Sequence, residues 1–335
     1  MNQSFNVQQQ RPADDTPEWP EFFRSEVEVF WQQQVNAKYF TAFDGIKLHF
    51  AYYKQSATAP LVVIAPGRIE SALKYQELFW ELAQQGFSVA ALDHRGQGLS
   101  ARLTHNPHQG HVEDFNDFVR DFADFTDQLA TLFGSVPKTL FSHSMGGTIA
   151  TIYCATYQHP YRKLILSAPM FSIETGKVPY WLARAVVAAG AWINRYLSKP
   201  WYFFCMGDYQ KVPFEDNVLT HSKQRYDTFR SVYDNVTDVQ LGGPTFNWLY
   251  EAISAAMNAQ KLANNITIPV LLFQAGNDKV VSASGQKKVA AMITRNPFRF
   301  ETIEGAHHEL MMETDKFRQP VLNAIIEETR ELITA

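Results

Sequence analysis

The fold class is indicated by one segment, Phe141-Ser142-His143-Ser144-Met145-Gly146-Gly147. It follows a run of β-forming residues and precedes a helical pattern from Thr148 to Tyr157. A sharp strand-to-helix turn with small residues around a serine is typical of a nucleophile elbow, which lifts the hydroxyl clear of a sheet. Ser142 and Gly146 are the small residues, although the usual pattern has glycine in the place of Ser142. The segment predicts Ser144 as a nucleophile, and the alternative is a structural turn with an incidental serine.

Two later segments supply candidates for the acid and the base that a nucleophilic serine needs. A strand-like run, Pro269–Gln274, is followed by a loop that contains Asp278, and a second run, Phe298–Ile303, is followed by a loop that contains His307 and His308. The order serine, aspartate, histidine, each after a strand, is typical of α/β-hydrolases. Asp278 is therefore predicted to orient the histidine, the alternative being an ordinary turn aspartate. From the residues alone, either histidine could be the base.

Attack on an ester also requires hydrogen-bond donors for the oxyanion, which are usually two backbone N–H groups. One is expected from Met145, directly after the nucleophile. The second should lie in the loop after the first inner strand, Ala65–Ser71, where Gly67 allows the backbone to turn toward the serine. We predict that the backbone N–H of Arg68 is this donor.

Strand-like runs and helical patterns alternate along most of the chain. Because this alternation is typical of a mainly parallel sheet with helices on both faces, we predict an α/β-hydrolase fold. In residues 39–53, apolar and polar residues alternate on either side of Asp44-Gly45, a pair suited to a two-residue hairpin turn. Helices are expected over Glu26–Val35 and from Thr314 onward. The strands expected in the sheet are Leu61–Ala65, Ser88–Leu92, Thr139–Ser142, Leu164–Ser167, Pro269–Gln274 and Phe298–Ile303.

The alternation stops after Met170, where the sequence becomes rich in aromatic residues, and strand-like runs resume at Pro269. We interpret the intervening part as a helical cap inserted into a hydrolase core. The predicted division is a polar N-terminal arm of residues 1–20, a core of residues 21–169 and 266–335, and a cap of residues 170–265.

Composition excludes several classes of protein. A chain of 335 residues that is 46% hydrophobic can bury a large core, so disorder throughout is excluded. A net charge of -4 gives no broad attraction to phosphate backbones, and no nucleic-acid partner is expected. The first residues lack the order of a signal peptide, and the most apolar stretch, Val178–Met206, is interrupted by charged residues and a proline. We therefore expect neither a signal peptide nor a transmembrane helix.

No metal or cofactor is expected. Cys154 and Cys205 are too few and too far apart for a disulfide framework or a thiolate metal site. His105, His108 and His111 lie in a segment with Pro and Gly, so the regular spacing that aligns metal ligands is not assured. We interpret these histidines as loop residues.

A family likeness is carried by Pro66–Ser71 with Lys74-Tyr75, Asp93–Gly98, Ser142–Gly147, Gly242–Thr245 with Trp248, and Gly305–Glu309. Together these segments resemble the bacterial inner-membrane lysophospholipases, in the monoacylglycerol-lipase-like branch of the α/β-hydrolases. The likeness runs from about residue 40 to the C-terminus and includes the cap segments Leu219–Ser222 and Gln224–Tyr226. In that family the histidine directly before the glutamate is catalytic, which selects His308. Where related lipases have His-Gly, this chain has Pro66-Gly67.

The resemblance implies a serine hydrolase that cleaves the fatty-acyl ester of lysophospholipids through an acyl-enzyme, with acyl transfer to another lipid alcohol as a further activity. It implies a cytoplasmic protein held peripherally at the inner face of the inner membrane. A monoacylglycerol lipase or general carboxylesterase is the close alternative, because the core motifs act on the same ester carbonyl. A non-catalytic lipid-binding protein on the same fold is the alternative of another class.

The cap contains a cluster of apolar and aromatic residues beside Arg184, Arg195 and Lys199. Such a mixture suits contact with an anionic membrane surface. It equally suits the interior of the cap, since a helix that is apolar on most sides is usually buried. Both interpretations stay open for Trp181, Val186, Val187, Trp192, Ile193, Tyr196, Trp201, Tyr202, Phe203 and Phe204.

Overall fold

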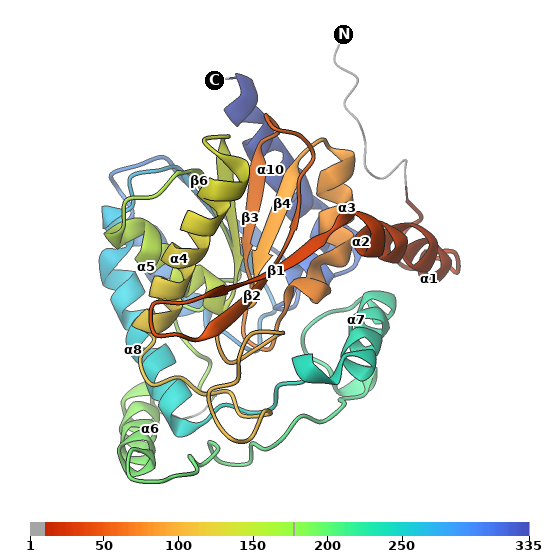
Figure 1. Ribbon diagram of the computed structural model, residues 1–335. Helices are drawn as coiled ribbons and strands as arrows, with labels where there is room; N and C mark the ends of the chain where they lie inside the picture. The colour runs from red at the N-terminus through yellow and green to blue at the C-terminus, as the bar shows by residue number, and fades with distance from the viewer. Residues whose placement is uncertain (1–10, 177, 335) are drawn as a thin grey trace.

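The computed structural model describes residues 11–176 and 178–334. Its centre is an eight-stranded sheet with the order β1-β2-β4-β3-β5-β6-β7-β8 (Figure 1). The pairs β1–β2 and β2–β4 are antiparallel and all other neighbours are parallel. The strands expected from Leu61 to Ile303 all form, with their ends shifted by three residues at most. The strands are β1 (Asn36–Thr41), β2 (Lys47–Tyr53), β3 (Leu61–Ala65), β4 (Ser88–Leu92), β5 (Lys138–His143), β6 (Tyr161–Ser167), β7 (Val270–Ala275) and β8 (Phe298–Ile303).

Helices connect these strands and also form much of residues 170–265, the predicted cap. The N-terminal helix begins at Trp19, earlier than the expected Glu26, because Trp19 is fully buried and Pro20 suits a first helical turn. The α-helices are α1 (Trp19–Phe22), α2 (Val29–Gln34), α3 (Gln76–Gln84), α4 (Asn116–Phe133), α5 (Met145–Thr156), α6 (Tyr180–Asn194), α7 (Lys223–Asn235), α8 (Phe246–Leu262), α9 (Ala283–Met292) and α10 (Asp315–Thr334). A π-helical segment, η2 (Phe23–Glu28), joins α1 to α2, and short 3₁₀ turns are η3 (Ala72–Tyr75), η4 (Phe214–Asp216), η5 (Thr237–Val239), η6 (Ala263–Asn265) and η7 (Leu310–Met312).

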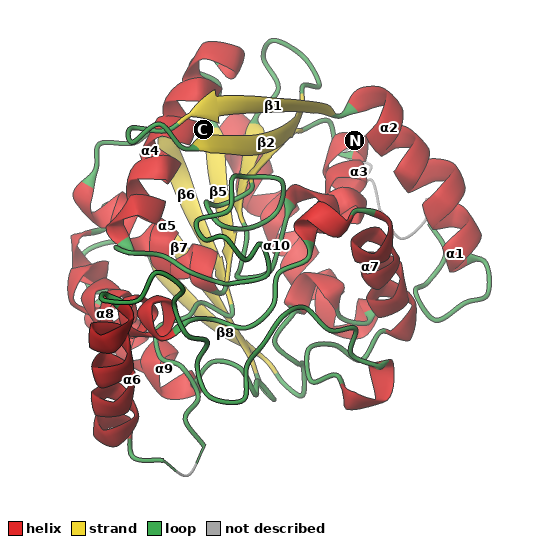
Figure 2. Ribbon diagram, turned by 60° about the horizontal axis from the view of Figure 1, so that its bottom comes forward, coloured by secondary structure: helices red, strands yellow, loops and turns green. Residues whose placement is uncertain are grey.

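The sheet is buried on both faces, which explains its continuous apolar strands. Successive residues of one strand point to opposite faces, so Val63 of β3 joins one apolar core and Val62 joins the other. Helices α4, α5 and α8 cover the face of Val63, and α3 and α10 cover the face of Val62 (Figure 2). This arrangement leaves the carboxyl ends of the parallel strands as the open edge, where ligands of such sheets bind.

The expected hairpin forms, but its loop is one residue longer than predicted. Ala42 donates to the carbonyl of Ile46 at 2.8 Å, and Gly45 donates to the carbonyl of Ala42 at 2.9 Å. Phe43, Asp44 and Gly45 therefore make a three-residue loop in place of a two-residue turn. Gly45 has φ 89°, the left-handed conformation that such loops require.

Within residues 170–265, α6 and α7 lie beyond one end of the sheet, whereas α8 runs back along it (Figure 1). Apolar residues of α8, including Ala252, Ala255 and Ala259, pack into the same core as α5. The contact between α6 and α8 is close, since a Cβ atom added at Gly190 would lie 2.2 Å from the ring of Phe246. Helix α8 thus joins the cap to the hydrolase core.

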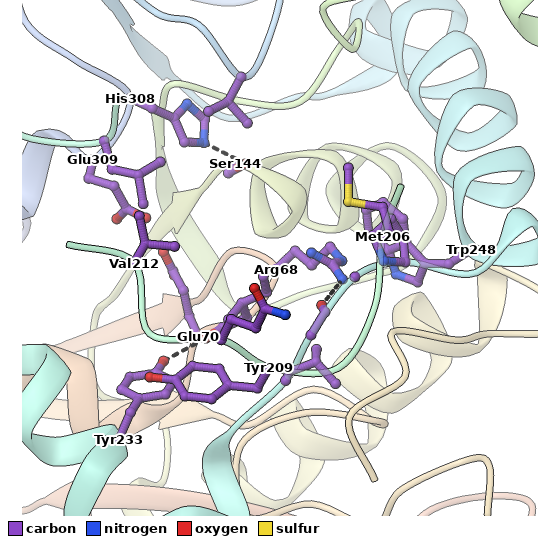
Figure 3. A pocket seen from close by; sticks show the side chains of 18 of the residues that line it. Arg68, Glu70, Ser144, Met206, Tyr209, Val212, Tyr233, Trp248, His308 and Glu309 are labelled. Carbon is purple, nitrogen blue, oxygen red and sulfur yellow. Dashed lines mark hydrogen bonds between the residues drawn. The ribbon is translucent and has the colours of Figure 1, made fainter. Parts of the chain in front are cut away.

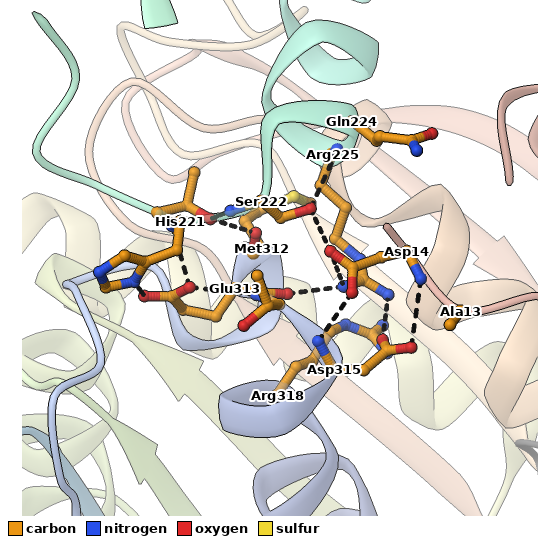
Figure 4. A network of polar contacts seen from close by, with 12 residues as sticks. Ala13, Asp14, His221, Ser222, Gln224, Arg225, Met312, Glu313, Asp315 and Arg318 are labelled. Carbon is orange, nitrogen blue, oxygen red and sulfur yellow. Dashed lines mark hydrogen bonds and ion pairs between the residues drawn. The ribbon is translucent and has the colours of Figure 1, made fainter. Parts of the chain in front are cut away.

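The described part of the expected N-terminal arm, residues 11–20, is tied down by buried charges (Figure 4). Arg11 pairs with Glu81 of α3 at 3.1 Å and with Asp315 of α10 at 2.7 Å. Asp14 accepts a hydrogen bond from the hydroxyl of Ser222, at the start of α7. This network links the N-terminal segment, the cap and the start of α10. Residues 1–10 of the expected arm lie outside the described residues.

Candidate active site

Ser144 stands between β5 and α5, at the open edge of the sheet. Its backbone has φ 50° and ψ -115°, a conformation that a residue with a side chain rarely adopts. Such strain is worth about 1–3 kcal/mol and persists only where neighbours hold it. Here the N–H of Ser144 donates to the carbonyl of Ser167 at 3.0 Å, and the N–H of Met170 donates to the carbonyl of Ser144 at 2.9 Å. The turn has the geometry of a nucleophile elbow.

The two small residues of the elbow have different reasons to be small. A Cβ atom at Gly146 would lie 2.0 Å from the carbonyl oxygen of Ala65 and 2.5 Å from that of Pro66, so only glycine allows the loop after β3 to approach. Ser142 is fully buried inside β5, and its hydroxyl donates to the carbonyl of Ile165 at 3.3 Å. The departure from glycine at this position is therefore accommodated by the neighbouring strand.

The loops after β7 and β8 bring an acid and a base to the serine. The Nε2 atom of His308 lies 3.0 Å from the Oγ atom of Ser144 (Figure 3), and its Nδ1 atom lies 2.7 Å from Oδ2 of Asp278. The other oxygen of Asp278 accepts hydrogen bonds from the backbone of Val280 at 2.8 Å and of Val281 at 3.0 Å. Burial alone would raise the pKa of Asp278, but the hydrogen bond and charge of His308 outweigh it and hold that pKa below its usual value. The three predicted residues thus form one hydrogen-bonded chain.

His307 points away from this chain. Its ring stacks on the ring of His221 with centroids 3.8 Å apart, and its backbone N–H donates to Glu313 at 2.7 Å. Burial, followed by the charge of His221, lowers the pKa of His307. Of the two histidines that the sequence left open, the structure places His308 beside the serine.

The expected oxyanion donors belong to two segments that contact each other. Met145 is the first residue of α5 and is fully buried. The loop that carries Arg68 is held at several points: Gly67 N–H donates to the carboxylate of Glu70, and Gln97 Nε2 donates to the carbonyls of Gly67 at 2.7 Å and Glu70 at 2.8 Å. A loop held this way keeps its backbone in one position, as an oxyanion site requires.

Ser144 and His308 open into a cavity of about 590 Å³ that lies between the sheet edge and the cap (Figure 3). Its size falls within the ordinary range of small-molecule sites. Arg68, Glu70, Lys74, His143 and Glu309 are its charged or polar residues near the serine. The apolar part of the wall comes mainly from the cap and is made by Met170, Ile173, Met206, Val212, Leu219, Phe229, Leu241, Trp248, Leu249, Val280 and Val281.

The part of the chain that forms this site is similar to known proteins. The family model Hydrolase_4, described as serine aminopeptidase, S33, matches residues 56–315, a range that contains the elbow, the acid and the histidine. The chain belongs to this family. It is 36% identical to lysophospholipase L2 of Escherichia coli (strain K12) over 303 residues, which cover 89% of this chain and 88% of that protein. It is 32% identical to the probable lysophospholipase L2 of Haemophilus influenzae, over 92% of this chain and 96% of that protein.

Among solved structures, the monoacylglycerol lipase of Paleococcus ferrophilus superposes with a TM-score of 0.65, covering 85% of this chain and 99% of that chain at 19% identity. At that identity the likeness shows the fold. The expected α/β-hydrolase fold is confirmed. The expected kinship with the lysophospholipases is also confirmed, since this Hydrolase_4 member is a homologue of lysophospholipase L2.

One feature of this Hydrolase_4 site was missed by sequence reasoning: a buried cluster of charges behind the serine. Lys74 Nζ lies 2.9 Å from Glu70 and 2.5 Å from Glu309, and His143 Nδ1 lies 2.8 Å from Glu70. His143 Nε2 also lies 3.2 Å from the backbone carbonyl of His308. The cluster therefore joins the oxyanion loop, the elbow and the histidine loop. The four residues belong to the segments that carry the family likeness. Their contact could not be predicted, because they lie too far apart in the chain for any sequence spacing to indicate it.

The charges of this cluster shift the ionisation of its members. Burial alone would lower the pKa of His143, but the charges of Glu70 and Glu309 outweigh it and raise that pKa to about 9. In the same way the charges of Lys74 and His143 overcome burial and hold the pKa of Glu70 well below its usual value. At neutral pH Lys74 and His143 are thus cations in close contact with the carboxylate of Glu70.

Proposed function

We propose that this chain is a serine hydrolase that cleaves the fatty-acyl ester of lysophospholipids through an acyl-enzyme. The observation that carries the proposal is the hydrogen-bonded chain from Ser144 through His308 to Asp278, which opens into a largely apolar cavity. A nucleophile in contact with an oriented base is the arrangement that acyl transfer requires. The named activity of the homologues, lysophospholipase L2, supports the choice of substrate class.

In the proposed reaction, His308 Nε2 takes the proton of Ser144 as its Oγ attacks the ester carbonyl carbon. Asp278 stabilises the imidazolium, and the backbone N–H groups of Arg68 and Met145 donate to the oxyanion. Collapse of the tetrahedral intermediate breaks the ester C–O bond, and His308 protonates the departing glycerol-side alcohol. Water then attacks the acyl-enzyme and releases the fatty acid, while a lipid alcohol in the place of water would accept the acyl group.

The apolar wall supplied by the cap is the proposed place of the acyl chain. Monoacylglycerol lipase and general carboxylesterase remain the alternative activities, because they need the same serine, histidine and acid. The discriminating assay is a panel of lysophospholipids, monoacylglycerols and short aryl esters at matched chain length. Preference for a monoacylglycerol or a short aryl ester would overturn the lysophospholipase proposal.

A fluorophosphonate probe tests the catalytic assignment itself. The wild-type protein should be labelled covalently, and Ser144→Ala should not be labelled. Ser142→Ala is a matched control, because it removes a second buried hydroxyl from the same elbow. Equal labelling of Ser144→Ala and wild type would show that the nucleophile is a different residue, and no labelling of a folded wild type would favour the non-catalytic lipid-binding alternative.

We also propose that α6 contacts a membrane surface, which accords with a peripheral place at the inner face of the inner membrane. The exposed fractions of Trp181, Trp192 and Tyr196 are 71%, 60% and 75%. Arg184 on this helix and Arg195, directly after its end, are exposed as well. Aromatic rings can enter the headgroup region while each cation near an anionic surface contributes about 1 kcal/mol. Within residues 11–176 and 178–334, no helix is long and apolar enough to cross a membrane.

A further inference from the structure

Arg68 places a largely desolvated cation on the wall of the cavity. Its Nη2 atom donates to the carbonyl of Gly242 at 2.6 Å, and its guanidinium lies 5.0 Å from the ring centroid of Trp248 (Figure 3). Its Nε atom is buried and has no hydrogen-bond partner. Among residues 11–176 and 178–334, no carboxylate lies within ion-pair distance of this guanidinium. A half-buried cation whose Nε atom is shielded from water is unfavourable unless an anion compensates it.

The carboxylates near the serine already have partners. Glu70 and Glu309 both contact Lys74, and Glu70 also contacts His143. Lys74 and His143 thus offset these two charges, whereas Asp208, farther along the same wall, accepts hydrogen bonds from the neutral side chains of Tyr202 and Asn106. Burial lowers the pKa of Arg68 to about 10, which leaves its guanidinium charged at neutral pH.

Two other groups on the same wall can also act as donors toward an anion. Arg230 of α7 stacks over the rings of Tyr226 and Phe229, at 5.0 and 4.9 Å, and makes no ion pair within the described residues. The hydroxyl of Tyr209 is buried without a partner. The cavity therefore offers an anion several unused donors, in addition to the guanidinium of Arg68.

We propose that the Arg68 guanidinium binds the phosphodiester of the lysophospholipid headgroup, so that this side chain selects lysophospholipids over uncharged monoacylglycerols. The inference rests on the proposed function. The loop that carries Arg68 also carries the proposed oxyanion donor, so the guanidinium and Ser144 face one cavity. In a lysophospholipid the glycerol unit joins the scissile ester to the phosphate, which makes these two contacts compatible. The planar guanidinium fork suits phosphate oxygens, and Trp248 and Gly242 hold it in place.

The test compares kcat/KM for 1-oleoyl lysophosphatidylethanolamine and 1-oleoylglycerol in mixed micelles of one neutral detergent. Arg68→Met should lower the ratio of the two values by about tenfold to a hundredfold, the usual effect of losing a hydrogen bond to a charged group. Arg68→Lys should lower it less, because it keeps the charge and loses the fork. Arg102→Met is the matched control, since Arg102 also donates to backbone carbonyls of a neighbouring segment, including that of Asp238, but lies outside the cavity.

The outcomes separate this inference from the function on which it rests. If the wild type prefers the lysophospholipid and Arg68→Met loses activity equally on both substrates, Arg68 only supports the Gly242 segment and the inference is wrong. If the wild type hydrolyses only the uncharged ester, the proposed function fails, and the phosphate site with it. If Arg68→Met does not fold, the other two variants still test the proposal. A kcat/KM ratio in Arg68→Lys equal to that of the wild type would contradict it, and so would a lowered ratio in Arg102→Met.

Discussion

Replacing Gly146 by alanine should uncouple the oxyanion loop from the nucleophile. The added Cβ atom would lie 2.0 Å from the carbonyl oxygen of Ala65, whereas an ordinary contact begins at 3.4 Å. The atoms that the Cβ would meet are the backbone carbonyl oxygens of Ala65 and Pro66, which cannot rotate away as a side chain could. The loop after β3 or helix α5 must therefore move back by about 1.4 Å. A misplacement of about 1 Å near reacting groups lowers turnover by about a hundredfold. The strain of overpacking should also lower the free energy of unfolding by about 1–3 kcal/mol.

The assay is steady-state hydrolysis of a short aryl ester together with chemical unfolding of the same samples. Ser142→Gly is the control in the same elbow, because it restores the usual glycine and adds no contact. It should keep turnover within about threefold of the wild type and lose about 1 kcal/mol of stability with its hydrogen bond. A folded Gly146→Ala protein with turnover within threefold of the wild type would refute the argument that this close approach positions the oxyanion donor.

Asp278→Asn should lower kcat on an aryl ester by about 10⁴-fold, as loss of the corresponding aspartate does in serine proteases, and His307→Ala by less than about tenfold. A greater loss in His307→Ala would show that the base is assigned to the wrong histidine. The pKa of His143, raised from 6.5 to about 9, means that its charge stabilises the fold fully below pH 6.5 and that this stability is lost as the pH rises through 9. The free energy of unfolding should therefore fall more over this range in the wild type than in His143→Gln, and equal slopes measured by urea unfolding would contradict the pairing. The wild type should co-sediment with anionic liposomes at low salt and be released at high salt, and the double change Trp181→Ala and Trp192→Ala should weaken the binding at low salt. Failure of the wild type to bind at low salt would end the membrane-surface proposal.

Local signals account for what could be predicted. The strand Phe298–Ile303 was predicted with its observed ends, because its β-forming residues are bounded by a proline and by turn residues. The elbow around Ser144 was visible because a turn of that shape needs small residues at fixed spacing. Asp278 was predicted from its position in the loop that follows a buried strand. Each of these features depends on residues that are neighbours in the chain. A short segment of the sequence is therefore enough to predict it.

Other features depend on which distant segments meet. The aromatic residues of α6 could have been cap core or surface, and only the packing of α8 against one side of α6 leaves Trp181 and Trp192 exposed. A hydrophobic pattern records that a residue is apolar and does not record whether a partner covers it.

The sequence by itself determined the fold class and predicted the nucleophile and the acid, since these depend on short segments next to strands. Tertiary structure alone decided how charges are paired. Glu70 and Glu309 are joined by Lys74 although they lie 239 positions apart in the chain, whereas Arg68 has no carboxylate partner among the described residues and contacts a carbonyl and an aromatic ring. The physical reason is that a charge is stabilised by whatever lies within a few ångströms of it, and those neighbours are chosen by the fold as a whole.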